Sequence, residues 1–324
     1  MNTKHIPEYT LSDGGKIPCI GMGTFGSDRV EAQEIADAVA GGIRAGFRLL
    51  DCAACYGNEA EIGEAIHGVL EEGVVKREDL FIMSKVWNDM HREVAASCKK
   101  SIEDLQCGYL DMLFIHWPFP NYHAPGCDGD ARNPDSRPFS AEEFLDTYRQ
   151  LEALADEGLI RYIGISNMTI PKLEAVLGQL RIPPAACESE IHPCFGQKEL
   201  VEYLKKKGIL PIGYMPLGSP RRPERDIAPE DVVDMEQPVM QQIAQAHGCH
   251  PAQICLQWAL QQGVLPIPFS VHHYEDNLKA VLAKPLTQEE MDAIFALECG
   301  NRLVKGQVFL WPGAGDWHEL WDEN

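Results

Sequence analysis

The stretch RLLDCAACYGNEAEIGEAI, residues 48–66, joins a short apolar segment ending on Asp51 to an amphipathic segment that begins after Tyr56. An apolar run of this length, followed by residues with helical periodicity, predicts a buried strand and then a helix. A carboxylate at the end of a buried strand needs a partner, because burying an unpaired charge is costly. The stretch therefore predicts a β–α unit and a cation elsewhere in the chain that lies beside Asp51.

The same unit recurs along the chain. Short apolar runs that predict strands occur at 20–24, 47–51, 80–84, 112–117, 161–166, 186–190, 209–214 and 264–269. Amphipathic segments that predict helices occur at 29–45, 58–72, 91–106, 140–157, 170–180, 197–207, 236–262 (two helices), 274–283 and 287–297. Eight β–α units predict an α/β fold, the closed (β/α)8 TIM barrel. A doubly wound parallel sheet is the alternative.

Two further segments flank the predicted barrel. The sequence YTLSDGGKIP, residues 9–18, predicts an N-terminal β-hairpin with an Asp-Gly-Gly turn, which we expect to plug the bottom of the barrel. The tail, residues 299–324, contains Phe309, Trp311, Trp317 and Trp321, and is too aromatic for a disordered end. The connections 117–140 and 217–235 are unusually long, which is typical of functional loops. No linker divides the chain, so we expect one domain over 1–324.

Composition limits the classes of function. The formal net charge is −21, which opposes binding to nucleic acid or to an anionic membrane surface. No apolar run is long enough to span a bilayer, and the N-terminus lacks a signal peptide, so we expect a cytoplasmic protein. The 11 cysteines do not resemble a disulfide framework. Cys52 and Cys55 form a C-x-x-C that fits apolar packing better than redox chemistry, and no zinc or other metal site is predicted.

Polar residues recur where the predicted strands end. In a barrel these positions share one rim, where barrel enzymes carry their chemistry. Taken singly, each has an ordinary structural interpretation, such as a solvated lysine or a hydrogen-bonded histidine. The positions are Asp51, Ser84, Lys85, His116, Ser166, Asn167, Glu188, Glu190, Tyr214 and Ser270.

Four residues form a catalytic candidate: Asp51, Tyr56, Lys85 and His116. A phenol with an ordinary pKa of about 10 transfers protons poorly at neutral pH, and a nearby ammonium lowers that pKa. A buried lysine needs a counter-ion, which Asp51 provides. A neutral histidine can donate a hydrogen bond to a carbonyl oxygen. Together the four suit proton delivery to a carbonyl that receives a hydride.

The segments GMGTFG, DCAACYGNEAEIGEAI, SKVWN, YLDMLFIHWP, IGISNM, ESEIHP and PLGS resemble the aldo-keto reductase superfamily, in the family's order over nearly the whole chain. The resemblance implies a (β/α)8 barrel with an N-terminal hairpin, a C-terminal loop over the site and an extended nicotinamide cofactor. It implies that Tyr56 is the general acid, that Lys85 and Asp51 tune it, and that His116 orients the carbonyl.

The resemblance also implies a set of cofactor contacts. Tyr214 matches the residue that stacks on the nicotinamide, and Ser166 and Asn167 match the pair that holds its carboxamide. The remaining matches are Gly23 and Thr24 at the ribose, Leu217 and Ser219 at the pyrophosphate, Ser270 beside the 2′-phosphate, and Asp276 and Asn277 at the adenine.

The chain departs from the family pattern in two places. Glu188 stands where a glutamine usually makes a third carboxamide contact, and a carboxylate accepts hydrogen bonds but cannot donate them. In PFSVHHYEDN, Phe269 replaces a lysine and an arginine is absent, so His272, His273 or the arginines of RRPER (Arg221, Arg222 and Arg225) would have to replace them. We expect NADP(H) as cofactor, with NAD(H) as the alternative.

The expected substrate is a small carbonyl compound, an aldehyde or ketone, in a pocket lined by Phe25, Trp87, Trp117 and Trp311. Polar residues in the loop 118–140 favour a sugar-like substrate, although a solvated loop explains them as well. Two other functions compete: a cofactor-binding regulatory subunit with little turnover, and a metal-dependent barrel hydrolase. The intact set of four residues opposes the first, and the absence of a His-x-His after the first strand opposes the second. The sequence does not predict an oligomeric state.

Overall fold

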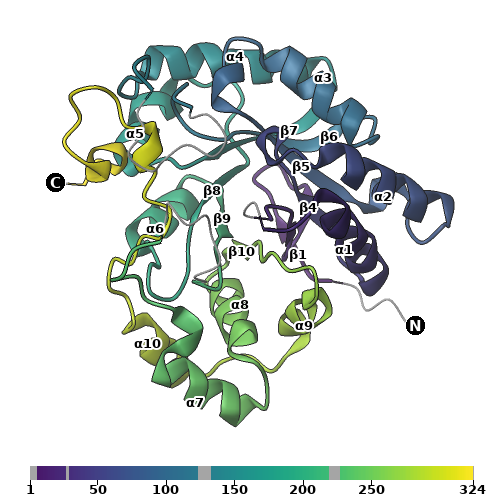
Figure 1. Cartoon of the computed structure of the whole chain (residues 1–324), viewed down its shortest axis with the longest axis vertical. Helices are drawn as coiled ribbons and strands as arrows, with labels where there is room; N and C mark the ends of the chain where they lie inside the picture. The colour runs from purple at the N-terminus through teal and green to yellow at the C-terminus, as the bar shows by residue number, and fades with distance from the viewer. Residues whose placement is uncertain (1–5, 27–28, 123–132, 219–226, 324) are drawn as a thin grey trace.

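Strands in chain order form one parallel barrel in this computed structural model, which describes residues 6–26, 29–122, 133–218 and 227–323. Each strand pairs in parallel with the next one along the chain, and helices surround them (Figure 1). The strands are β3 (Met22–Gly23), β4 (Leu49–Asp51), β5 (Phe81–Val86), β6 (Leu110–Ile115), β7 (Ile160–Ser166), β8 (Ala186–Glu190), β9 (Leu210–Tyr214) and β10 (Leu265–Pro266). The TIM barrel predicted from the sequence is confirmed.

The barrel closes between its last strand and its first. The Gly21 N–H donates to the Pro266 carbonyl at 3.1 Å, and the Gly23 N–H donates to the Pro268 carbonyl at 3.0 Å. Since proline has no N–H, neither Pro266 nor Pro268 can donate in return, so few hydrogen bonds cross this thin seam. The missing N–H groups also explain why the strand predicted at 264–269 is only two residues long. The run GMGTFG, residues 21–26, has the spacing of a dinucleotide-binding loop, yet its first glycines form the seam.

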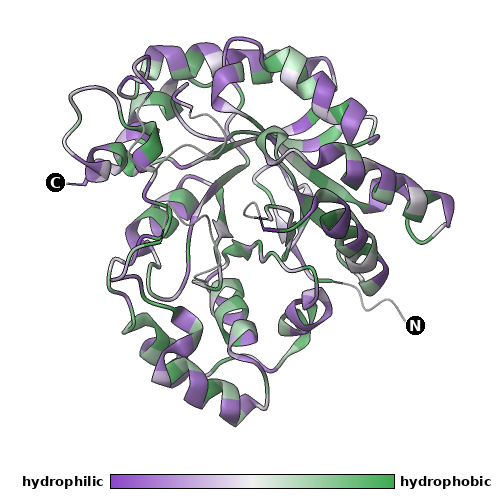
Figure 2. Ribbon diagram, viewed as in Figure 1, coloured by the Kyte–Doolittle hydropathy of each residue, from purple (hydrophilic) through white to green (hydrophobic). Residues whose placement is uncertain are grey.

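The helices carry hydrophobic residues toward the strands and hydrophilic residues outward, so both colours occur on each helix in Figure 2. Most begin or end within three residues of the predicted bounds, and the Thr287–Glu290 capping box is present. The helices are α1 (Ala32–Ala45), α2 (Glu59–Glu71), α3 (Val94–Asp104), α4 (Ala141–Asp156), α5 (Ile170–Val176), α6 (Lys198–Lys206), α7 (Pro238–His247), α8 (Pro251–Gln261), α9 (Tyr274–Lys279) and α10 (Gln288–Phe295).

Short 3-10 turns lie between these elements and shape the loops at both ends of the barrel. They are η1 (Ala54–Tyr56), η2 (Arg77–Asp79), η3 (Asn88–Met90), η4 (Leu177–Gln179), η6 (Asp234–Glu236), η7 (Ala280–Leu282), η8 (Gln307–Phe309) and η9 (Trp317–Trp321). Among the residues described, none of the helices combines the length and apolarity needed to cross a bilayer.

The predicted hairpin covers the bottom of the barrel. Strands β1 (Glu8–Thr10) and β2 (Lys16–Pro18) pair antiparallel, and the Tyr9 hydroxyl donates to the Leu260 carbonyl at 3.1 Å. Leu11 and Ile17 are buried against apolar side chains of the barrel interior. The lower half of the barrel is therefore sealed with apolar contacts, which leaves the carboxyl ends of the strands as the open rim.

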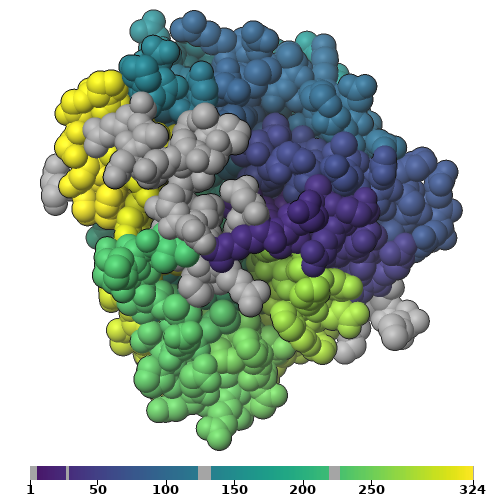
Figure 3. All heavy atoms as spheres, in the orientation of Figure 1, coloured from purple at the N-terminus to yellow at the C-terminus, as the bar shows by residue number. Residues whose placement is uncertain are grey.

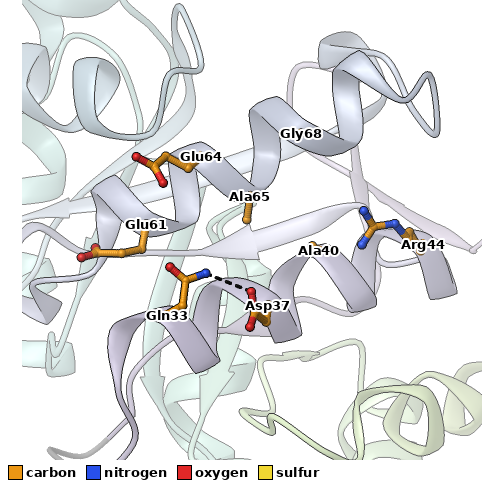
Figure 4. Close-up of a pocket in the computed structure, with 8 residues that line it drawn as sticks. All are labelled: Gln33, Asp37, Ala40, Arg44, Glu61, Glu64, Ala65 and Gly68. Carbon is orange, nitrogen blue, oxygen red and sulfur yellow. Dashed lines mark hydrogen bonds between the residues drawn. The ribbon is translucent and has the colours of Figure 1, made fainter.

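A close approach of α2 to the end of α3 requires a glycine. A methyl group at Gly63 would lie 1.9 Å from the Asp104 carbonyl oxygen. This clash could be relieved only if the backbone of α2 or of the end of α3 moved. We expect Gly63→Ala to lower the free energy of unfolding by about 1–3 kcal/mol, measured by urea denaturation. Gly68→Ala is the matched control, because Gly68 lies on the same helix beside the open groove between α1 and α2 (Figure 4) and no atom lies within 4 Å of its added methyl. Equal stability of the two variants would contradict this account.

Candidate active site

Strand alternation places the candidate residues in one polar layer. Side chains two residues apart on a strand share a face, and one face of each barrel strand points inward. A lower inward layer is apolar and contains Leu49, Met83, Phe114, Ala186 and Ile212. Two residues further along the same strands stand Asp51, Lys85, His116, Glu188 and Tyr214. The sequence thus changes from apolar to ionisable side chains at one height of the barrel.

Asp51 and Lys85 form a buried ion pair within this layer. The Lys85 Nζ lies 2.5 Å from Asp51 Oδ1 and also donates to the Cys52 carbonyl at 3.2 Å. Only 1% of Lys85 is exposed. Although burial lowers the pKa of this ammonium, Asp51 and Glu188 outweigh burial and hold it well above the ordinary value. Lys85 is therefore a fixed positive charge at the centre of the rim.

Glu188 supplies a second carboxyl group to the same lysine. Its Oε1 lies 3.5 Å from Lys85 Nζ, and its Oε2 has no hydrogen-bond partner among the described residues. Burial, with the nearby Asp51 carboxylate, raises the pKa of Glu188 to about 8 although Lys85 opposes the rise. One cation thus faces two carboxyl groups, of which Asp51 is the closer.

Tyr56 lies above the ion pair, in the short turn η1 that follows β4. The Lys85 Nζ is 5.3 Å from the centre of its ring. Burial raises the pKa of the Tyr56 phenol well above the ordinary 10.0, although the charge of Lys85 acts in the opposite direction. The expectation that Lys85 brings this pKa below its ordinary value is therefore wrong for this arrangement, because burial exceeds the effect of the ammonium. The phenol keeps its proton at neutral pH and can give it away.

His116 follows β6 and faces Tyr56. The two rings meet edge to face with their centres 5.8 Å apart, and Trp87 also meets the imidazole edge to face, at 5.1 Å. The Cys55 Sγ lies 3.5 Å from Nδ1 of the histidine. Burial, reinforced by the positive charge of Lys85, holds the pKa of His116 well below its ordinary 6.5. The imidazole is neutral, so it can donate a hydrogen bond without carrying charge.

Asn167 connects three strand ends. Its backbone is left-handed, with φ of 58°, and its Nδ2 donates to the His116 carbonyl at 2.9 Å. The Tyr214 hydroxyl donates to Asn167 Oδ1 at 2.8 Å. The hydroxyl of the adjacent Ser166 is buried without a partner in the described part of the chain. Ser166 and Glu188, which are paired in register on β7 and β8, thus each present one unsatisfied polar atom.

The predicted ribose side of the site is built from backbone contacts. The Thr24 hydroxyl donates to the Asp51 carbonyl at 2.8 Å, and Asn58 Nδ2 donates to the Thr24 carbonyl at 2.8 Å. Gly23 packs closely against Ile267, and a methyl group added to it would lie 3.2 Å from the isoleucine side chain. Phe25 is 39% exposed, and its ring lies tilted against Tyr56 with the ring centres 5.0 Å apart, which puts it at the mouth of the barrel.

The remaining predicted cofactor residues lie on the far side of the rim. The Ser270 hydroxyl accepts from the backbone N–H of His272 at 3.3 Å and of His273 at 2.8 Å. Asp276 pairs with Lys279 at 2.6 Å, whereas Asn277 is buried. Leu217 is half-buried against the core. Ser219, Arg221, Arg222 and Arg225 lie outside the described residues.

The aromatic tail packs over the opposite side of the barrel. Phe309 lies 4.5 Å from Trp117 and 5.9 Å from Trp87, ring centre to ring centre. Asn121 Nδ2 donates to the Phe309 carbonyl at 2.8 Å, so its amide holds the tail. Trp117 is only 5% exposed within this cluster, and Trp311 is half-buried at its edge. In the space-filling view the tail, in yellow, lies at the left edge of the molecule (Figure 3).

A buried triad that sequence reasoning missed fastens the tail. His192 donates from both ring nitrogens to carboxylates, with Nδ1 2.8 Å from Asp234 Oδ2 and Nε2 3.1 Å from Glu190 Oε1. Glu190 also accepts from the backbone N–H of Leu303 at 2.6 Å and of Val304 at 2.8 Å. The two carboxylates raise the pKa of His192 to about 9 although burial opposes them. Glu190 is among the polar strand ends found from the sequence, but no sequence pattern indicates Asp234.

The described residues hold no group of three or more His, Cys, Asp or Glu side chains suited to a metal ion.

The model of the aldo/keto reductase family matches residues 19–298. The chain is 39% identical to an aldo/keto reductase of Synechocystis sp., over 97% of this chain and 96% of that protein. It is 37% identical to an aldose reductase of Encephalitozoon cuniculi, over 91% and 94%. A Bombyx mori aldo-keto reductase solved in complex with NADP superposes with a TM-score of 0.82 at 27% identity, over 93% and 95%.

Proposed function

This chain belongs to the aldo/keto reductase family, and we propose that it reduces the carbonyl group of a small aldehyde or ketone to an alcohol, with a nicotinamide cofactor. The observation that carries the proposal is the buried Asp51–Lys85 pair beside a protonated Tyr56 and a neutral His116. A regulatory subunit without turnover has no use for this set, and the family supports the enzyme.

The residues present fit a nicotinamide carboxamide. The Ser166 hydroxyl and Glu188 Oε2 are buried polar groups without partners among the described residues, and the carboxamide offers both an NH2 donor and a carbonyl acceptor that would satisfy them. We propose that Ser166, Asn167 and Glu188 hold this group and that Tyr214 supports the ring. Gly23 and Thr24 would lie at the ribose, Leu217 and Ser219 at the pyrophosphate, and Ser270, Asp276 and Asn277 at the adenosine end. When bound, the cofactor supplies the hydride that the carbonyl carbon accepts.

The protein supplies the proton and the orientation. His116 donates a hydrogen bond to the carbonyl oxygen, because its neutral ring carries an N–H without repelling the Lys85 ammonium. Tyr56 gives its phenolic proton to the same oxygen as negative charge develops there. Lys85 stabilises the phenolate that remains, and Asp51 holds the ammonium in place at 2.5 Å. In this proposal Tyr56 and His116 touch the substrate, whereas Lys85 and Asp51 act through Tyr56.

Aromatic side chains at the mouth indicate the shape of the substrate. Phe25 and Trp87 flank Tyr56 and His116, and Trp311 lies at the edge of the tail cluster. Trp117 is too deeply packed to present more than an edge. Such walls suit the apolar face of a sugar-like aldehyde, and one relative is named an aldose reductase. Asn121, a polar residue of the loop 118–140, is hydrogen-bonded to the tail, so it does not support a sugar-like substrate.

We propose NADP(H) rather than NAD(H), because the superposed Bombyx mori enzyme was solved with NADP. Lys279, which follows β10, is already paired with Asp276, so the 2′-phosphate needs another cation. The arginines of the segment 221–225 are candidates.

Titration of the protein with NADPH and with NADH, followed by quenching of tryptophan fluorescence, tests both cofactor and function. We expect NADPH to bind at least about tenfold more tightly. Replacing Arg221, Arg222 and Arg225 together by Ala should remove this advantage and leave NADH binding unchanged, whereas Arg44→Ala, outside the site, should change neither. Equal binding by the two cofactors would reverse the NADP(H) assignment. If neither bound, the reductase function itself would be wrong.

We further propose that residues 1–324 act as one domain, because the hairpin and the tail both pack on the barrel. A cytoplasmic location is supported by the ten described cysteines, which are all free thiols and are typical of a reducing compartment. The net charge of −21 supports a small-molecule partner rather than nucleic acid.

A further inference from the structure

Glu188 is a surplus carboxyl group in the polar layer. Among the described residues, the ion pair that Glu188 makes is with Lys85, and that ammonium is already bonded to Asp51 at 2.5 Å and to the Cys52 carbonyl at 3.2 Å. Glu188 reaches Lys85 only at 3.5 Å, and its Oε2 receives no hydrogen bond from the described residues. Only 2% of the residue is exposed, so bulk water solvates this carboxyl group poorly. An ionised Glu188 would be a poorly compensated buried charge.

The neighbours of Glu188 on every side favour its neutral form in the absence of a further cation. Asp51 on β4 repels a second negative charge, and Lys85 on β5 is shared. Tyr56 on η1 and Tyr214 on β9 are neutral phenols whose own ionisation Glu188 opposes. The Cys187 thiol, on the same strand, is buried and neutral, with its pKa raised to about 12. A neutral cofactor ring leaves the protonated form of Glu188 favoured, whereas a positively charged ring favours its carboxylate.

We propose that Glu188 is a redox-linked proton site: it keeps its proton beside the reduced cofactor and releases it to water beside the oxidised one. This inference rests on the proposed nicotinamide function. The step is a proton loss alone, in which the Glu188 O–H bond breaks, a carboxylate remains against the positive ring and the proton passes to water. No electron moves within the step. Glu188 thereby becomes the counter-ion of the oxidised cofactor, and Asp51 remains that of Lys85.

Two measurable consequences follow from this coupling. Because burial raises the pKa of Glu188 to about 8 in the protein without cofactor, binding of NADP+ at pH 7 should release most of one proton per site, whereas NADPH should release none from this group. The affinity for NADP+ relative to NADPH should rise about tenfold between pH 6.5 and pH 8, since the carboxylate is increasingly preformed. A glutamine, which has no proton to release, would give neither effect.

Titration calorimetry at pH 7, in two buffers with different enthalpies of ionisation, measures the protons released. NADP+ and NADPH carry the same phosphates, so the difference between the numbers of protons that they release reports the effect of the charge on the nicotinamide ring. We expect that difference to vanish in Glu188→Gln and to persist in Glu59→Gln. Glu59 is the matched control, because it is also buried with a raised pKa, yet it is bonded to Ser84 at 2.6 Å and Ser101 at 2.8 Å outside the layer.

The outcomes separate the two proposals. Equal proton release with NADP+ and NADPH in the wild-type protein would overturn the role of Glu188, and this measurement needs no variant to fold. A difference that survives in Glu188→Gln would assign it to another group and overturn it equally. Failure of both cofactors to bind would instead remove the proposed reductase function.

Discussion

Tyr56→Phe is expected to lower kcat by about a thousandfold and to leave the Kd for NADPH within about twofold. The variant removes the only proton that the phenol can give to the substrate oxygen, while its ring still packs on Phe25 at 5.0 Å and on His116 at 5.8 Å. Since the pKa of Tyr56 lies well above 10.0, the phenol is protonated throughout the neutral range and this loss is not masked by ionisation.

Steady-state reduction of a small aldehyde, with NADPH consumption followed by absorbance, measures kcat. Fluorescence titration measures the Kd of the same samples. The control is Tyr203→Phe on the outer helix α6, where the Lys207 ammonium lies over the ring and the phenol has no part in the rim. Turnover of Tyr56→Phe within about tenfold of the wild type would mean that another group delivers the proton, and the mechanism would be wrong.

His192→Gln is expected to lower the free energy of unfolding by about 3–5 kcal/mol. The variant leaves Glu190 and Asp234 facing each other in a site where both side chains and the imidazole are fully buried. It also loosens the tail, because Glu190 holds the backbone of Leu303 and Val304. The control is His67→Gln, which breaks an exposed pair with Glu71 on α2 and should cost less than about 0.5 kcal/mol.

The same triad predicts how stability depends on pH. The pKa of His192 rises from 6.5 in the unfolded chain to about 9 in the folded protein. Its contribution is therefore fully present below pH 6.5 and is lost as the pH rises through 9, a total of roughly 3 kcal/mol. Glu188, raised to about 8, adds a loss of the same sign between pH 4.5 and 8. Urea denaturation at several pH values should give a flatter profile for His192→Gln than for the wild type above pH 6.5. Parallel profiles would contradict the charged triad.

The repeated β–α pattern was sufficient to predict the barrel, and β8 has the bounds that its residues indicated, Ala186–Glu190. The pattern also brought Asp51, Lys85 and His116 to one rim, since the carboxyl ends of parallel strands meet there. It could not predict that Asp234, from a long loop, reaches His192, because such contacts depend on how a loop folds back. Nor could it predict that burial exceeds the effect of Lys85 on Tyr56, since composition does not reveal the depth of a phenol.

Before the barrel closes, β10 is the free edge of a parallel sheet, and such edges recruit strands from neighbouring molecules. Parallel sheets also form slowly, so this edge is exposed for longer than a hairpin edge would be. Pro266 and Pro268 leave it with carbonyl acceptors and without the N–H donors that a foreign strand needs for two-way pairing. The N–H groups of Gly21 and Gly23, from the first strand region of the same chain, are the donors that pair with these carbonyls. The lack of N–H donors at this edge therefore disfavours aggregation of the folding chain until β3 of the same chain pairs with β10.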